Sequence, residues 1–330
     1  MTTKTKSRNG ANRAASNATS KRNSTTTKTA LSGQPHKRSR STPDQVLARL
    51  EAAKRILKTI QPCSVRAVCY QLFNAKLIPD MSKNSTNAIS RQLARAREDG
   101  VIPWEWIVDE TRAAERPSRW SEPDSIIKAA VNGYRRDNWQ DQPVRVEVWA
   151  EKGTVRGTLA PVLDELGVTL RVMHGFSSAT VVNDIAEEST IGDKPMIALY
   201  CGDFDPSGMA MSERDLPKRL DKYGADVDLR RICLLPSDID GIPQFDASTK
   251  TGDPNHKWFT GHYGNRCAEL DAMRPPDLRE RVRAAILAEM DTDAWARALE
   301  VEEAEVASMG EFLRAWSERG NDGGLGYGES

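Results

Sequence analysis

Strands alternate with helices through the middle of the chain, and this order restricts the fold more than any other feature. Short apolar segments at 144–149, 168–173, 196–201 and 229–235 have the length of buried strands. The segments between them have the apolar spacing of amphipathic helices. Strands joined through helices lie parallel in one sheet, with right-handed crossovers. We therefore predict an α/β fold whose ligands bind beyond the carboxyl ends of the strands.

Acidic side chains follow two of these strands. Glu151 follows the first strand, in "VEVWAEKGT", and Asp203 and Asp205 follow the third, in "ALYCGDFDPSGMAM". Two such close carboxylates repel unless a positive group lies between them or one is protonated. Three carboxylates at one sheet edge would suit Mg²⁺, which prefers oxygen ligands and usually also binds phosphates. The alternative is an ordinary turn, since Asp, Pro, Ser and Gly are common turn residues.

The region before the sheet has the pattern of three helices followed by a β-ribbon. Apolar residues recur at helical spacing over 43–60, and further helices are expected over 64–75 and 85–99. The segment "VIPWEWIVDE" is expected to form the ribbon. This order is typical of a winged helix-turn-helix domain, whose third helix contacts DNA. Our candidate DNA-binding residues on that helix are Arg91, Arg95 and Arg97, and a merely solvated basic face is the alternative.

The formal net charge of zero hides an uneven distribution. Residues 1–43 contain ten Lys or Arg and no Asp or Glu, with almost no large apolar residues. We expect a basic disordered arm there, which either binds phosphate backbones without reading sequence or only solubilises the chain. No segment resembles a signal peptide or a membrane span, and the five cysteines form no C-x-x-C pair. These features predict a soluble cytoplasmic protein with reduced thiols and no membrane partner.

The chain divides into six predicted regions. They are the basic arm (1–43), the winged helix-turn-helix domain (44–120), a helical connector (121–143), the parallel α/β domain (144–250), a helical C-terminal extension (251–318) and a flexible tail (319–330).

The acidic motifs resemble a known domain. A Glu after the first strand and D-x-D-P-x-G after a later one are similar to the Toprim domain of topoisomerases, primases and related nucleases. The form "GDFDPSG" behind a winged helix most resembles the topoisomerase VI A subunit and the related meiotic double-strand-break transesterase, in a bacterial or phage-type member. The later "AELDAM" also resembles a segment of such members, and the likeness covers roughly residues 44–290.

This resemblance implies a function and a site. Mg²⁺ would be held by Glu151, Asp203 and Asp205, with Glu151 as ligand or general acid–base. The substrate would be double-stranded DNA, and the protein a homodimer in the cytoplasm of the cell or phage host. The tyrosine of one protomer would meet the metal site of the other. No Gly-rich ATP site is visible, so any ATPase partner would be a separate subunit.

The same family places a nucleophilic tyrosine four residues after an arginine. In "SVRAVCYQLF", Arg66 and Tyr70 share a helical face, so Arg66 would steady a phosphate while Tyr70 attacks it. The product would be a phosphotyrosyl intermediate. The preceding residue is Cys69, where the family usually has an aromatic. Two alternatives remain: a Toprim nuclease that hydrolyses DNA, like the Wadjet nuclease subunit, with Tyr70 in the core, or a non-catalytic DNA-binding regulator.

Overall fold

The computed structural model describes residues 42–108, 119–173, 179–191 and 194–322. Residues 1–41 of the predicted basic arm and 323–330 of the predicted tail lie outside these ranges. Within the ranges, no helix is both long enough and apolar enough to cross a membrane.

Three helices form the N-terminal part of the described chain. They are α1 (Pro43–Ile60), α2 (Val65–Asn74) and α3 (Lys83–Glu98). Each begins at a hydroxyl cap: Thr42, Ser64 and Ser82 accept hydrogen bonds from backbone N–H groups of the first turn. The apolar faces meet in one core that includes Leu57 and Leu72. The three predicted helices are therefore confirmed.

The β-ribbon expected from "VIPWEWIVDE" is wrong for residues 101–108, the part of it that the structure describes. Trp104–Trp106 form a 3-10 turn, and Ile107 makes a single parallel bridge with Cys63. Arg97 explains this shape, because its Nη2 donates to the carbonyl oxygens of Trp104 and Ile107, at 2.9 and 3.0 Å. Its guanidinium also lies 4.4 Å from the centre of the Trp104 ring system. These contacts occupy carbonyl groups that a ribbon would offer to a neighbouring strand.

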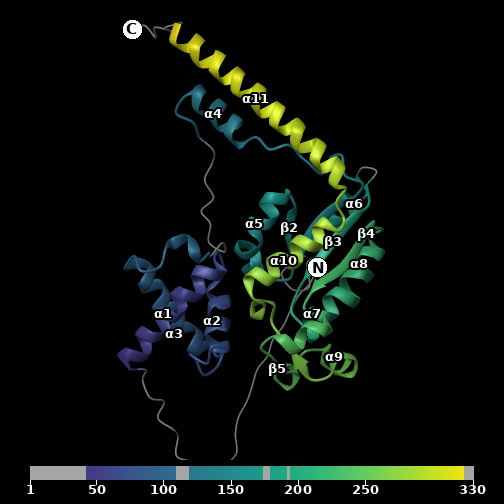
Figure 1. Ribbon diagram of the computed structural model, residues 1–330. Helices are drawn as coiled ribbons and strands as arrows, with labels where there is room; N and C mark the ends of the chain where they lie inside the picture. The colour runs from purple at the N-terminus through teal and green to yellow at the C-terminus, as the bar shows by residue number, and fades with distance from the viewer. Residues whose placement is uncertain (1–41, 109–118, 174–178, 192–193, 323–330) are drawn as a thin grey trace, which may run out of the picture. The chain divides into compact units, whose positions relative to one another are not determined.

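The predicted parallel sheet is confirmed. Its strands are β1 (Arg145–Ala150), β2 (Thr169–Val172), β3 (Met196–Cys201) and β4 (Val227–Cys233). All neighbouring pairs are parallel, in the order β2-β1-β3-β4 (Figure 1). In the register of the two central strands, Ala150 lies opposite Cys201. The residues that follow β1 and β3 therefore leave the same edge of the sheet side by side.

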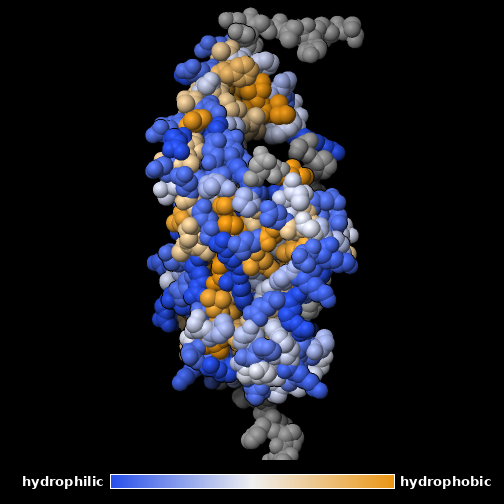
Figure 2. Space-filling view, turned by 90° about the vertical axis from the view of Figure 1, so that its right-hand side faces the viewer, coloured by the Kyte–Doolittle hydropathy of each residue, from blue (hydrophilic) through white to orange (hydrophobic). Residues whose placement is uncertain are grey.

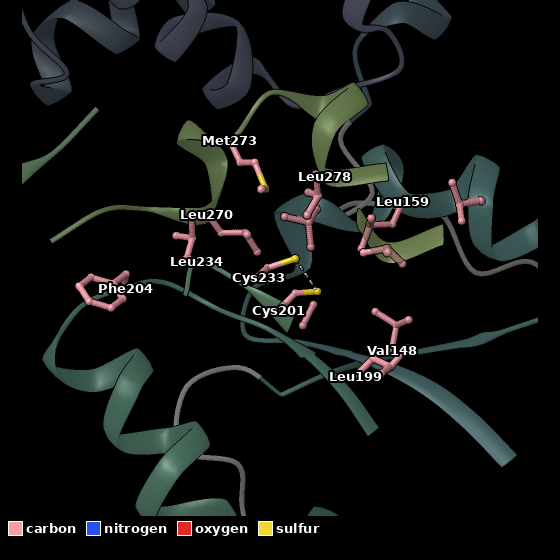
Figure 3. Packing of buried hydrophobic residues seen from close by; sticks show 14 of the residues in the cluster. Val148, Leu159, Leu199, Cys201, Phe204, Cys233, Leu234, Leu270, Met273 and Leu278 are labelled. Atoms are coloured by element: carbon pink, nitrogen blue, oxygen red, sulfur yellow. Dashed lines mark hydrogen bonds between the residues drawn. The ribbon is translucent and has the colours of Figure 1, made fainter. Parts of the chain in front are cut away.

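Side chains of β3 alternate between two cores. Leu199 and Cys201 pack with Val148 and with side chains of α5 (Arg156–Leu166) and α10 (Pro275–Leu287), as Figure 3 shows. The other face of β3 packs on α6 (Ala179–Ser189) and α8 (Leu216–Lys222). The Sγ atoms of Cys201 and Cys233 lie 3.3 Å apart, and all five cysteines are free and buried. A strand covered on both faces explains why 196–201 is a continuous apolar run.

The helix expected over 207–224 is present but interrupted. It divides into α7 (Pro206–Ala210), a π-helical turn (Met211–Asp215) and α8. Pro217 lies in the first turn of α8, and a proline has no N–H to donate to the carbonyl group four residues earlier. The regular ladder of hydrogen bonds is therefore broken in front of it.

Six short elements follow β4. They are η5 (Pro236–Gly241), β5 (Phe245–Asp246), η6 (Ala247–Lys250), α9 (His256–Tyr263), β6 (Arg266–Cys267) and η7 (Leu270–Ala272). β5 and β6 form an antiparallel pair. This segment brings its last residues back to the edge of the main sheet, where Ala268 forms an antiparallel bridge with Phe204.

The described part of the chain ends in a long helix, α11 (Thr292–Asp322), that lies along α4 (Pro123–Gly133) (Figure 1). Glu305 of α11 accepts hydrogen bonds from Tyr134 at 2.6 Å and from Arg136 at 2.8 Å. Several large apolar side chains on the two helices remain exposed, among them Ile126 and Phe312. Figure 2 shows apolar patches on the surface at this end of the molecule.

Candidate functional site

The carboxyl ends of β1 and β3 bring the three predicted acidic residues together. The backbone N–H of Glu151 donates to the carbonyl of Cys201 at 2.9 Å, which continues the sheet by one residue. The Glu151 Oε2 atom then accepts a hydrogen bond from the N–H of Asp203 at 2.9 Å. Glu151, Asp203 and Asp205 are 8%, 2% and 2% exposed. The sequence reading of one acidic cluster at this edge is therefore supported by direct contact.

Small residues make this close packing feasible. A Cβ atom on Gly208 would lie 2.3 Å from the Asp203 carbonyl oxygen and 2.8 Å from the Glu151 carboxylate. Asp205 caps α7, and its Oδ1 accepts from the N–H of Gly208 at 2.9 Å. The motif "GDFDPSG" thus forms a tight turn into a helix, but a turn whose aspartates are buried rather than solvated.

Arg231 of β4 holds the backbone of the same turn. Its Nη2 donates to the carbonyl oxygens of Gly202 and Asp203, at 2.8 and 2.6 Å. Its Nη1 donates to the hydroxyl of Ser212 at 2.8 Å. One guanidinium thus satisfies several carbonyl and hydroxyl groups that burial would otherwise leave without partners.

Two lysines neutralise the aspartates. Lys152, directly after Glu151, forms an ion pair with the Asp203 Oδ2 atom. Lys250, at the end of η6, forms an ion pair with the Asp205 Oδ2 atom at 2.8 Å. Neither lysine was singled out from the sequence. They answer the question of how two aspartates tolerate each other, because each has a cation of its own.

Burial and crowding perturb the titration of the cluster. Burial raises the pKa of Glu151 to about 7, and the charges of Asp203 and Asp205 add to that rise. Burial also raises the pKa of Asp203, although Lys152 opposes the shift. A carboxyl group with a pKa near 7 can accept and release a proton at neutral pH, as a general acid–base must.

Two further carboxylates, Glu269 and Asp271, join the cluster from "AELDAM". The backbone of Phe204 forms an antiparallel bridge with Ala268, and the N–H of Leu270 donates to the Asp203 Oδ1 atom at 3.0 Å. Asp271 is 5% exposed, and burial raises its pKa. The sequence had marked this segment only by its resemblance, and the acidic residues on either side of Leu270 were the available signal.

Arg66 and Tyr70 lie together on α2, as predicted. The Arg66 guanidinium carbon is 5.6 Å from the centre of the Tyr70 ring. Arg66 donates its Nε–H to the Glu269 Oε2 atom at 2.7 Å, and Asp271 accepts from the Ser64 hydroxyl at 3.2 Å. Two contacts therefore join α2 to the segment that carries the acidic residues.

Tyr70 is only 5% exposed. Burial raises its pKa well above the usual range for a phenol, the charge of Glu269 raises it further, and Arg66 opposes the shift. The residue also lines a cavity of about 440 Å³ together with Arg66, Lys250 and Glu269. Since Lys250 also contacts Asp205, this cavity and the acidic cluster share a side chain.

The three predicted DNA-binding arginines divide into two kinds. Arg91 and Arg95 are exposed on α3 and line a hollow of about 340 Å³ with Val46 and Leu50 of α1. Arg97 is engaged with the carbonyl groups and the ring of the segment after α3, as described above. The structure thus gives Arg97 a role in holding the N-terminal part together.

The donor chemistry of the cluster fits the Mg²⁺ expected from the sequence, since carboxylate oxygens are its preferred ligands. In the described ranges, however, no three His, Cys, Asp or Glu side chains are already arranged to hold a metal ion. Lys152 and Lys250 form ion pairs with the Oδ2 atoms of Asp203 and Asp205, respectively. A metal at this site would have to replace both ammonium groups.

Comparison with protein-family models finds no family that matches the chain. Comparison with curated proteins finds no match either. The function therefore has to be argued from the site itself.

Proposed function

We propose that this protein is a Mg²⁺-dependent DNA-cleaving enzyme similar to the topoisomerase VI A subunit, in which Tyr70 forms a covalent bond to the cleaved strand. The observation that carries the proposal is that Tyr70 and the acidic cluster are linked, within one chain, through the side chains of Lys250 and Arg66. Lys250 lines the cavity of Tyr70 and pairs with Asp205, and Arg66 links α2 to Glu269. A nucleophile (Tyr70) and two cations therefore lie near Glu151, whose pKa is about 7.

The fold supports this proposal in two respects. A four-stranded parallel sheet with acidic residues at the carboxyl ends of β1 and β3 is compatible with a Toprim domain. Three helices with exposed Arg91 and Arg95 on the third are compatible with a winged helix-turn-helix domain that binds double-stranded DNA.

The proposed reaction is an in-line exchange at phosphorus. A bond forms between the Tyr70 oxygen and phosphorus as the bond to a deoxyribose oxygen breaks. Glu151 would take up the phenol proton and return a proton to the leaving deoxyribose oxygen. Mg²⁺, held by Asp203 and Asp205 with Glu151 left free to exchange the proton, would stabilise the negative charge on the phosphate.

The resemblance to this family also suggests a homodimer and a separate ATPase subunit. In the family, tyrosine and metal site come from different protomers. Here the cavity of Tyr70 includes Lys250 and Glu269 of its own chain, and this favours an arrangement in which one chain can supply both.

A second candidate function is hydrolysis of DNA by a Toprim nuclease in which Tyr70 is structural. The burial of Tyr70 and its raised pKa favour this alternative, because both make the phenol harder to ionise. In this case water attacks the phosphate and no covalent adduct forms.

Cleavage of supercoiled plasmid DNA with Mg²⁺ distinguishes the two functions. Under the first, protein remains bound to DNA ends after denaturation, and Tyr70→Phe abolishes both adduct and cleavage. Tyr223→Phe, at the end of α8, is the control and should cleave like the parent. If Tyr70→Phe cleaves at the parent rate without any adduct, the enzyme is a hydrolase.

A further inference from the structure

The cavity beside Tyr70 is lined by both polar and apolar side chains. The polar residues are Arg66, Tyr70, Asp80, Gln244, Thr249, Lys250 and Glu269, and the apolar residues are Phe73, Pro79, Met81, Pro243 and Phe245. Concave sites with apolar walls and a few convergent polar groups are the usual form of small-molecule sites, and 440 Å³ lies within their range of about 300–1,000 Å³.

We propose that this cavity binds one unpaired nucleotide of the DNA substrate. Its phosphate would lie between Arg66 and Lys250, and its base would contact Phe73 and Phe245. This inference rests on the proposed function, because it names the part of the substrate that reaches Tyr70.

Burial of Tyr70 is the first reason. Tyr70 is 5% exposed, so little of its side chain can contact the backbone of a regular duplex lying on the surface. A nucleotide turned out of the base stack can enter a pocket, and enzymes that act on buried parts of nucleotides bind their substrates in this way.

The two cations that line the cavity, Arg66 and Lys250, are the second reason. Lys250 already contacts Asp205 at 2.8 Å, but an ammonium group has three N–H donors and can bind a phosphate oxygen as well. Arg66 carries five donors in a planar group that suits phosphate oxygens.

The aromatic walls are the third reason. Phe73 and Phe245 are partly buried and pack against two different cores, so each ring is held by its own part of the chain. Bases stack on such rings with little regard to sequence, because every base has an aromatic face. The walls therefore suit a nucleotide of any sequence better than a specific small metabolite.

The test uses the full chain without Mg²⁺, so that no cleavage occurs. Fluorescence anisotropy compares three labelled 20-base-pair duplexes: one fully paired, one with an extra unpaired thymidine, and one with an abasic residue in place of that thymidine. We expect at least fivefold tighter binding to the duplex with unpaired thymidine than to the other two. The abasic duplex separates base binding from simple flexibility of the DNA.

Two variants locate the effect. Phe245→Leu keeps an apolar side chain but removes the ring, and Lys250→Gln removes the charge from a partly exposed position. Each should lower the preference for the unpaired thymidine to less than twofold, measured as the ratio of the dissociation constants of the two duplexes for the same variant. Lys257→Gln, an exposed lysine on α9, is the control and should keep the preference.

Equal binding of all three duplexes, or a preference that survives in both variants, would overturn the inference. The result is independent of the proposed chemistry, because it needs neither Mg²⁺ nor cleavage. A thymidine preference without any covalent adduct would support the cavity and contradict the transesterase. A covalent adduct without the thymidine preference would support the transesterase and contradict the proposed role of the cavity.

Discussion

Arg66 of α2 and Glu269, which precedes η7, form a hydrogen-bonded ion pair with an Nε–Oε2 distance of 2.7 Å. The two residues are 203 positions apart in the sequence. Their side chains are 38% and 20% exposed, so water screens the pair in part. Through this contact the helix of Tyr70 is attached to the segment whose N–H groups also bind Asp203.

We expect this ion pair to couple the two residues energetically. In a double-mutant cycle with Arg66→Gln and Glu269→Gln, the coupling free energy should be about 1 kcal/mol, as for partly screened pairs with good geometry. Urea denaturation of the four proteins measures it. The more exposed pair Arg266–Asp240 is the control and should show no measurable coupling. Equal coupling free energies in both pairs would mean that the Arg66–Glu269 contact stabilises the fold no more than an exposed surface pair.

Stability without metal should fall as the pH rises from 5 to 7.5. The folded pKa of Glu151 is raised to about 7, so the folded state binds more protons than the unfolded chain over this interval. The stabilisation is complete below the ordinary glutamate pKa and is lost as the pH rises through 7, by an amount on the order of 2 kcal/mol. Glu151→Gln, which mimics the protonated form, should flatten the profile when unfolding is followed in EDTA.

Asp203 and Asp271 have raised pKa values of the same sign, so part of the slope should remain in Glu151→Gln. A profile identical to that of the parent would show that Glu151 ionises normally in the folded protein.

Magnesium should raise the melting temperature by a few degrees at concentrations well above its dissociation constant, since it would bind the folded state only. Asp203→Asn and Asp205→Asn should each remove most of this rise. Asp228→Asn on β4, an exposed position, should not. Lys152→Gln should increase the response to Mg²⁺, because it removes a cation that competes for Asp203. An unchanged Mg²⁺ response in both aspartate variants would exclude the metal site.

Replacing the arginines of α3 should have two different effects, one on DNA binding and one on stability. Replacement of Arg91 and Arg95 by Ala should weaken DNA binding and reduce the slope of log K against log salt by about two, one for each lost phosphate contact. Arg97→Ala should instead lower stability by about 1 kcal/mol, because one exposed and one partly buried carbonyl group lose a charged donor. Normal DNA binding by the double variant would indicate that α3 does not face DNA.

Local signals predicted the elements well. The helical spacing of apolar residues over 43–60 and the apolar run of 196–201 each follow from a few neighbouring residues, and the structure contains the helix and the strand that they indicate. The ribbon failed because Arg97 binds the carbonyl groups of the next segment, which no periodicity reveals.

The position of the acidic residues could be predicted from the sequence, but the position of their cationic partners could not. Glu151, Asp203 and Asp205 follow strands whose ends meet by topology, so their proximity follows from the strand order. The contact between Lys250 and Asp205 spans 45 positions and arises from how the segment after β4 returns to the sheet. Only the folded chain brings these side chains together.

The bonds from Arg231 to Gly202, Asp203 and Ser212 have a consequence for how tightly a substrate can bind. A loop that becomes ordered only around its ligand loses conformational entropy at that moment, and this loss weakens binding. Here the guanidinium of β4 fixes the turn during folding, before any substrate arrives. The acidic turn is therefore preorganised, and a ligand that reaches it should find its shape already set.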